Sequence, residues 1–291
     1  AKKYADIYNG KSYENYEDAI NQFDAVIVSL PHFLHAPICL DLINNHKYIF
    51  VEKPFVTDYK SGLNITEIAN KNNKPICVGN FRRYRKNGLW LKEFLDSEDL
   101  GNIEEFYFYE GGKYNWPVST DSFWKKELAG GGVLFDTGAH TVDQMCWWLN
   151  GDIELLSYKD DQLGGVEADC SAEFKLANGA KGYLELSRTR NLGAKAIFIG
   201  SKGKIEIGLV DSFLKSEPKS LLEKKYAGIN GNKIPVQSYV DLMSIQILKW
   251  MNAIKKKSSN YITSEDVLPS ISLINNCYER REEWNLEWVK C

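Results

Sequence analysis

The 291-residue chain has the length of one large domain or two ordinary ones, and its 44% hydrophobic content is enough for a buried core. Its 36 basic and 39 acidic residues leave a net charge of −3, which gives no electrostatic reason to expect a nucleic-acid or anionic-membrane partner. No apolar run approaches the ~20 residues that a membrane span needs. The composition therefore predicts a globular protein without nucleic-acid or membrane partners.

The six cysteines are scattered along the chain, and no Cys-x-x-Cys pair occurs. Cys39, Cys77, Cys146 and Cys170 lie in apolar stretches and are expected in the core. This usage favours a reducing, cytoplasmic location over a disulfide framework. Because the four histidines form no ligand cluster, the sequence predicts no metal site.

The first 100 residues alternate short apolar strands with helices. Such an alternation is typical of a parallel sheet that is covered on both faces. The predicted strands are 25–30, 48–51 and 75–78, and the predicted helices are 15–23, 36–45 and 58–72, followed by a helix over 89–95 that leads to the second part of the chain.

The pattern changes near residue 102, where strands with a two-residue period begin. Residues 166–176 alternate between an apolar face and a polar face that includes Glu167 and Asp169. Asn178-Gly179 follows, which is the strongest short signal for a hairpin. Residues 101–266 are therefore predicted to form a mostly antiparallel α+β domain, with further strands at 103–110, 182–188, 196–199 and 204–209.

The end of the chain is predicted to be helical. Apolar residues at 3- and 4-residue steps indicate an amphipathic helix over 240–254. Thr263, with Asp266 three residues later, is typical of a helix start, and the apolar pattern continues over 267–284. The polar stretch 211–232 is expected to be a mobile excursion.

Charged and polar residues follow two of the predicted parallel strands. Glu52, Lys53 and Pro54 come directly after strand 48–51, where ligands of open parallel sheets bind, although the same three residues also suit a surface turn. Asn80, with Arg82 or Arg83, follows strand 75–78. Either arginine could approach a ligand or pair with a carboxylate between domains.

Residues 130–143 read Gly-Gly-Gly-Val-Leu-Phe-Asp-Thr-Gly-Ala-His-Thr-Val-Asp. A flexible glycine run leads into a segment that carries Asp136, His140 and Asp143. If the segment is helical, the 4- and 3-residue spacings put all three side chains on one face. Asp136 could then orient the His140 ring in a proton-transfer pair. The alternative is a glycine loop followed by a solvated helix face.

Together these motifs resemble the Gfo/Idh/MocA family of NAD(P)-dependent oxidoreductases. That family carries Glu-Lys-Pro after a Rossmann strand and a Gly-Gly-Gly-x-Leu-x-Asp-x-Gly-x-His-x-x-Asp stretch further on. Residues 24–35 and 78–84 also resemble family segments, and the similarity runs from residue 1 to about residue 288. It implies a Rossmann-type domain over 1–100, an antiparallel-sheet domain for substrate and oligomer contacts over 101–266, and a C-terminal helix, within 267–291, that packs back on the first domain.

The resemblance also implies roles for individual residues. His140 would exchange the hydroxyl proton, Asp136 would bond the ring or the substrate hydroxyl, and Lys53 would stabilise charge on the reacting oxygen. The alternative for Lys53 is a salt bridge to a neighbouring carboxylate. The predicted cofactor contacts are Pro31, His35, Glu52, Lys53, Pro54, Asn80 and Arg82, and the predicted substrate contacts are Lys53, Arg83, Tyr114, Trp116, Asp136, His140 and Asp143. His35 could equally be a helix-start residue, Tyr114 and Trp116 could serve domain packing, and Asp143 could only hold its helix to a neighbour.

One feature of the family is not present. No Gly-x-Gly-x-x-Gly, the turn that cradles a cofactor pyrophosphate, occurs in the 291 residues. The sequence is therefore interpreted as an incomplete Rossmann-type domain without its phosphate-binding βαβ segment. NAD or NADP is inferred from the resemblance, and weak NAD(H) binding is expected of these 291 residues.

The leading hypothesis is an NAD(P)-dependent oxidoreductase that acts on a carbinol carbon of a sugar, an inositol or a nucleotide-sugar. The alternatives are an NAD-dependent glycosidase of the same family and a redox-inactive small-molecule binding protein. Family members commonly associate through the second-domain sheet. A homo-oligomer, a dimer or a tetramer, is therefore expected here.

Overall fold

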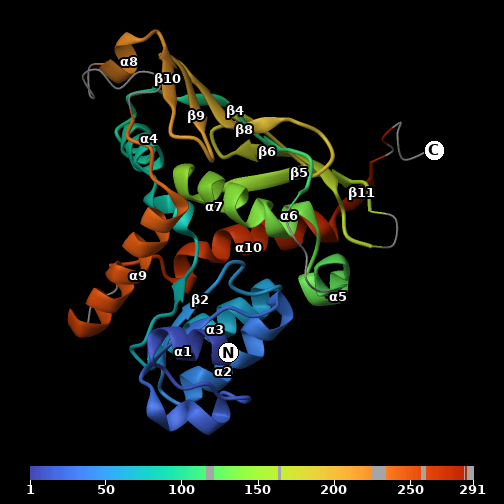
Figure 1. The fold of residues 1–291 in the computed structure, drawn as a ribbon. Coiled ribbons are helices and arrows are strands. Elements are labelled where there is room, and N and C mark those ends of the chain that lie inside the picture. The colour runs from blue at the N-terminus through green and yellow to red at the C-terminus, as the bar shows by residue number, and fades with distance from the viewer. Residues whose placement is uncertain (116–120, 163–164, 224–233, 257–259, 285, 287–291) are drawn as a thin grey trace.

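The computed structural model places a small parallel sheet and its helices against a larger, mostly antiparallel sheet (Figure 1). This arrangement confirms the predicted fold class, an α/β Rossmann-type domain followed by an α+β open-sheet domain. The structure describes residues 1–115, 121–162, 165–223, 234–256, 260–284 and 286.

The first domain is built on three short parallel strands in the order β1-β2-β3. Three of the four residues of the central strand β2 are buried, because it has a strand on each side and helices over its faces. The elements are β1 (Ala25–Val28), β2 (Tyr48–Val51), β3 (Cys77–Val78), α1 (Lys2–Tyr8), α2 (His35–Asn44), α3 (Tyr59–Lys71) and the 3₁₀ turns η1 (Glu17–Gln22), η2 (His32–Leu34) and η3 (Phe81–Tyr84).

Strand β1 is an edge of this sheet. It pairs with β2 on one side, and among the described residues no strand pairs with its other side. Ile27 is 50% exposed, and α1 buries none of its residues. Apolar side chains that a parallel α/β sheet ordinarily covers are thus open at this edge.

The second domain is an eight-stranded sheet in the order β10-β9-β8-β4-β7-β6-β5-β11. Neighbouring strands are antiparallel except for two parallel pairs, β4 with β7 and β11 with β5. The hairpin predicted at Asn178-Gly179 joins β6 to β7. The strands are β4 (Ile103–Gly111), β5 (Ile153–Asp160), β6 (Asp169–Leu176), β7 (Lys181–Ser187), β8 (Gly193–Gly200), β9 (Gly203–Gly208), β10 (Leu214–Glu217) and β11 (Arg281–Glu283).

A layer of helices covers one face of the large sheet, and the main core lies between them. Phe106 and Phe108 of β4 point into this core, whereas Tyr107 and Tyr109 lie half-buried on the opposite face. The remaining helices are α4 (Lys86–Asp96), η4 (Asp121–Trp124), α5 (Lys126–Ala129), α6 (Val133–Asp136), α7 (Gly138–Trp148), α8 (Ser220–Glu223), α9 (Tyr239–Lys256) and α10 (Ser264–Glu279).

Helix α10 lies between the two domains (Figure 1). It begins with the capping box predicted at Thr263 and Asp266, in which each side chain accepts the other residue's main-chain N–H. Along its length it contacts α3 and β3 of the first domain and α7 and β5 of the second. The helix predicted to pack on the first domain therefore packs on both.

Several predicted elements differ in the structure. The segment 15–23 forms the 3₁₀ turn η1, and the last helix ends at Glu279 because the chain turns to form β11. Glu167 and Asp169, predicted on a polar face, are buried because each has hydrogen-bond partners inside the protein. The expected excursion 211–232 contains β10 and α8, and residues 224–232 lie outside the described residues.

Candidate active site

A cleft of about 780 Å³ opens between the two domains. The carboxyl end of β2 and turn η3 form its floor on the first-domain side, and residues from β4, α6, α7 and β7 form the other wall. Of the predicted site residues, six line this cleft: Glu52, Lys53, Arg82, Tyr114, Asp136 and His140. Phe81, Glu110, Phe123, Arg188, Asp211 and Tyr239 line it as well.

Lys53 reaches across the cleft to Asp136. Its Nζ donates to Oδ1 of the carboxylate at 2.8 Å and to the main-chain carbonyl of the same residue at 3.0 Å. Burial would raise the pKa of Asp136, but the charges of Lys53 and Arg188 outweigh it and hold that pKa below its usual range. An ionised carboxylate thus fixes the Lys53 ammonium in the cleft.

His140 is the first-turn histidine of α7, and only 6% of it is exposed. Its ring meets Phe81 edge-on, with 5.0 Å between the ring centroids. Nδ1 is buried without a hydrogen-bond partner among the described residues. Burial lowers the pKa of His140 well below its usual range, and the charges of Arg82, Lys53 and Arg85 lower it further. The ring is therefore neutral at neutral pH, which is the state that can accept a proton.

Asp136 makes no hydrogen bond to His140 among the described residues, so of its two predicted partners, the ring and the substrate hydroxyl, only the hydroxyl stays open as a prediction. Asp136 is the last residue of α6, and Thr137 separates it from α7, which carries His140. Both oxygens of Asp136 already have cationic partners, since Lys53 donates to Oδ1 and Arg188 donates to Oδ2 at 3.0 Å. The four-residue spacing brought both side chains to one cleft without pairing them.

Sequence reasoning missed Arg188, which follows β7 and is 7% exposed. Its guanidinium carbon lies 5.1 Å from the ring centre of Tyr114 and 4.7 Å from that of Phe123. A lone arginine after a strand carries no motif. No local pattern in the sequence therefore marked this residue.

Arg82 is held by Glu110 of β4 through two hydrogen bonds of 2.8 Å. Thr141 of α7 donates to the same carboxylate at 2.5 Å. This network ties the floor of the cleft to the sheet and to α7. Arg82 lines the cleft, but its predicted contact with cofactor stays a prediction.

Arg83 and Asp143 pair with each other away from the cleft. Two hydrogen bonds of 2.9 and 2.6 Å join the guanidinium to the carboxylate, and Arg83 also donates to the main-chain carbonyl of Asp266. Neither residue lines the cleft. The arrangement is the interdomain pairing that the sequence left open as an alternative, and it gives no support to the predicted substrate contacts.

The other predicted cofactor residues do not line the cleft. Both ring nitrogens of His35 lie against main-chain carbonyls, of Pro54 at 2.8 Å and of Leu30 at 2.9 Å, so this ring ties two strand ends together. Pro31 is exposed, and Asn80 is buried next to Pro54 in a separate small cavity. Trp116 lies outside the described residues.

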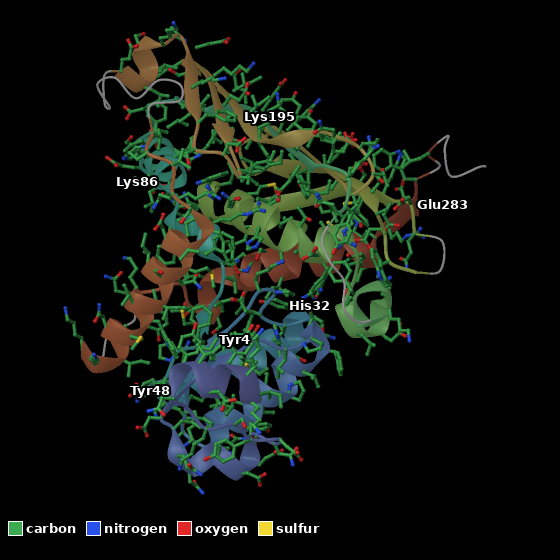
Figure 2. All side chains as sticks on the ribbon, viewed as in Figure 1. Tyr4, His32, Tyr48, Lys86, Lys195 and Glu283 are labelled. Carbon is green, nitrogen blue, oxygen red and sulfur yellow. The ribbon has the colours of Figure 1, made fainter. Side chains whose placement is uncertain are left out.

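The neighbouring His32 joins the domains. It lies at the top of the first domain, close to α5 (Figure 2), and its Nδ1 donates to the main-chain carbonyl of Ala129 at 2.9 Å. Ala129 directly precedes the glycine run. This hydrogen bond holds the start of the glycine run, just before the N-terminus of α6, to the first domain.

The glycine run is tightly packed, and the prediction that it is flexible was wrong. Gly130 has a φ of +86°, which favours glycine, and a Cβ at Gly131 would overlap the Tyr278 ring. A Cβ at Gly132 would overlap the main chain of Glu167. The Glu167 carboxylate accepts hydrogen bonds from the N–H groups of Gly132 at 2.8 Å and Leu134 at 3.0 Å and from Tyr278 at 2.7 Å. These contacts fix the start of α6 and so the position of Asp136.

The substitution Gly132→Ala is therefore expected to lower the free energy of unfolding by about 3 kcal/mol. The added methyl group would meet the main chain of Glu167, which cannot move aside as a side chain can. Gly112→Ala is the matched control, since a Cβ there meets nothing within 4 Å. Urea unfolding of both variants measures the difference. Equal stability of the two variants would contradict the close packing of the run.

Among the described residues, no group of three or more His, Cys, Asp or Glu side chains could hold a metal ion. In the same residues no helix is long and apolar enough to cross a membrane. Cys39, Cys77, Cys146 and Cys170 are buried and unpaired, as predicted, and Cys277 is as well.

Parallel strands that end in an interdomain cleft, closed by an open antiparallel sheet, define a two-domain protein of the Rossmann type. Family models agree on both parts of the chain. The oxidoreductase family with an NAD-binding Rossmann fold matches residues 1–80, and the Gfo/Idh/MocA C-terminal domain matches residues 89–206. The chain belongs to the Gfo/Idh/MocA family.

Over the aligned residues, the curated relatives are between 26% and 33% identical to the chain. "Oxidoreductase P35" of Formosa agariphila is 28% identical over 218 residues, which are 71% of this chain and 65% of the relative. An inositol 2-dehydrogenase of Salmonella typhimurium is 33% identical over 157 residues, which are 53% of this chain and 44% of the relative. The chain thus matches less than two thirds of the length of these relatives.

Solved structures have the same fold. A 3-ketoreductase from Actinomadura kijaniata, solved with NADP and TDP-benzene, superposes with a TM-score of 0.82 at 19% identity. The match covers 97% of this chain and 86% of the reductase chain. A levoglucosan dehydrogenase, solved with NADH and levoglucosan, has a TM-score of 0.79 at 18% identity, and the match covers 96% of this chain and 85% of the dehydrogenase chain. At these identities the likeness concerns the fold alone.

Proposed function

We propose that the protein transfers a hydride between a nicotinamide cofactor, NAD or NADP, and a carbinol carbon of a sugar, an inositol or a nucleotide-sugar. One observation carries the proposal. A neutral, buried imidazole and an ammonium fixed by an ionised carboxylate line the same cleft at the carboxyl end of a parallel strand. Family membership supplies the expected class of reaction.

Two side chains divide the proton chemistry. Oxidation of an alcohol removes the hydroxyl proton, and neutral His140 is suited to accept it at a ring nitrogen. In the opposite direction the protonated ring returns that proton. The Lys53 ammonium donates a hydrogen bond to the reacting oxygen and stabilises the negative charge that develops there.

Asp136 has a supporting part in this scheme. With a lowered pKa and two cationic partners, it stays ionised and holds Lys53 toward the cleft. A carboxylate bound in this way is a poor proton acceptor. We therefore assign the proton transfer to His140 and the orientation of Lys53 to Asp136.

The residues after β2 fit a nicotinamide cofactor. The Glu52 carboxylate packs over Gly79, where a Cβ would lie 2.8 Å from Oε2, and its one hydrogen bond in the described part of the chain is to the adjacent Lys53 N–H at 3.3 Å. It therefore has acceptor capacity left for a ligand. Bound there, the cofactor would accept or supply the hydride, and Glu52 and Lys53 would contact it.

An activity screen tests the proposal. The full-length gene product is incubated with NAD⁺ or NADP⁺ and a panel of inositols, aldoses and nucleotide-sugars, and reduced cofactor is followed by its absorbance. Turnover that needs both cofactor and a polyol is expected. Cleavage of an aryl glycoside without accumulation of NADH would favour the glycosidase instead, and binding without either reaction would favour the binding protein.

The exposed face of the large sheet supports a homo-oligomer. Tyr107, Tyr109 and Tyr183 form a half-buried aromatic cluster there, and Leu156 is 42% exposed. A broad sheet face of this kind is a candidate contact between copies of the chain. The described cysteines, all buried and unpaired, support the proposed cytoplasmic location.

A further inference from the structure

Arg188 joins the Asp136 carboxylate to the wall of the cleft. One edge of its guanidinium faces α6, where Nη2 donates to Oδ2 of Asp136 at 3.0 Å and lies 3.4 Å from the main-chain carbonyl of Gly132. The side chain is 6% exposed, and the Asp136 carboxylate is 25% exposed. At this depth an ion pair holds its geometry better than a pair on the surface does.

The rest of the guanidinium is enclosed by aromatic rings. Tyr114 and Phe123 both line the cleft, and their ring centres lie 5.1 and 4.7 Å from the guanidinium carbon. These two rings stack on each other with centroids 5.6 Å apart, and Trp124 lies 5.9 Å from Arg188. A guanidinium among aromatic faces gains from cation–π attraction.

Two further contacts define what Arg188 does. The main-chain N–H of Tyr114 donates to the carbonyl of Arg188 at 2.9 Å, so the aromatic segment is anchored to the end of β7. Nε and Nη1 are buried and have no hydrogen-bond partner among the described residues. The contacts of Arg188 run to Asp136, to the Gly132 carbonyl and to the aromatic rings, so it is placed to hold these neighbours in position.

We propose that Arg188 is the positioning residue of this site, and that it couples the orientation of Asp136 to the aromatic wall, Tyr114 and Phe123, against which a sugar ring packs. The inference rests on the proposed function. Asp136 is shared between two cations, so the place of Lys53 depends on Arg188. The apolar side of a sugar ring stacks on aromatic side chains, and a wall held by a planar cation presents them in one arrangement.

Two substitutions separate the parts of this proposal. Arg188→Met fills much of the same space without a charge, whereas Arg188→Lys keeps a charge without the planar fork. Arg190→Lys is the matched control, because Arg190 lies two residues further, pairs with Asp169 and Glu185 and does not line the cleft. Thermal unfolding of all three variants shows whether each one folds.

The first measurement needs no substrate. In protein labelled with ¹³C at aspartate carboxyls, Asp136 is identified by the signal that Asp136→Asn removes, and its titration is followed with pH. Arg188→Met is expected to move the titration of Asp136 to higher pH, because one of the two cations that favour the carboxylate is gone. Arg190→Lys is expected to leave it unchanged. This measurement stands whether or not the proposed activity is found.

The second measurement is steady-state kinetics with a polyol from the activity screen. Arg188→Met is expected to lower kcat/KM by about 10²-fold, with the loss largest at low pH, and Arg188→Lys is expected to raise KM more than it lowers kcat. An unchanged titration of Asp136 in Arg188→Met would overturn the proposal. A loss of activity that matched Arg190→Lys in KM, kcat and pH profile would overturn it as well.

Discussion

Replacing His140 by alanine in the full-length protein is expected to cut turnover by ~10²–10⁴-fold and to leave cofactor affinity nearly unchanged, because a positioned acid–base group acts on the transition state. The ring is buried against Phe81, and its side chain makes no described hydrogen bond, so the substitution removes the proposed proton acceptor without breaking one. Single-turnover rates and calorimetric titration with NAD(H) measure the two effects.

The pH dependence of oxidation tests whether His140 is the group that accepts the proton. A base must be neutral to accept a proton, so the rate falls as pH drops through its pKa. Because burial and nearby cations lower the pKa of His140, we expect the acid limb of kcat/KM to lie below the ~6.5 of an ordinary histidine. Near-normal turnover of His140→Ala, or an acid limb well above that value, would show that another group takes the proton.

Lys53→Ala is expected to lower turnover by about 10²–10³-fold and also to weaken binding of substrate or cofactor, since the ammonium acts on bound ligands as well as on the transition state. The variant also leaves Asp136 with Arg188 as its one remaining cationic partner. Kinetics with KM and kcat resolved separately, together with cofactor titration, measure both losses.

The control for Lys53 is Lys195→Ala. Lys195 lies on the large sheet far from the first domain, and its pairing with Glu206 at 3.8 Å is on the surface (Figure 2). The substitution Lys195→Ala removes one positive charge from the protein, and Lys195 does not line the cleft. If both lysine variants lost activity equally, the effect of Lys53 would be one of net charge, and its proposed contact with the reacting oxygen would be wrong.

The sequence predicted the parts of the site that follow from local spacing. Lys53 follows a buried strand, and such positions meet at one edge of a parallel sheet. His140 and Asp136 were predicted to share a helix face, and both do line the cleft. The strand and hairpin pattern likewise predicted both sheets. Alternation of apolar and polar residues indicates a strand with one buried face, and a short apolar run indicates a strand that is buried on both faces.

The pairing of side chains could not be predicted in the same way. Asp136 and Arg188 are 52 residues apart in the chain, and Arg83 and Asp143 are 60 apart, so only the folded structure decides which charges meet. The glycine run read as flexible because spacing does not show a neighbour such as Glu167, which packs on the main chain at Gly132. Long-range close contact is the information that local patterns do not contain.

The most direct test of the central claim follows the hydride itself. The full-length protein is given NAD⁺ or NADP⁺ and a polyol deuterated at its carbinol carbons, and the reduced cofactor is analysed by mass spectrometry. The account predicts that deuterium appears in the reduced cofactor of the wild type and that Lys53→Ala/His140→Ala forms it at least ~10²-fold more slowly. Reduced cofactor without deuterium, or a doubly substituted protein as fast as the wild type, would contradict hydride transfer at this cleft.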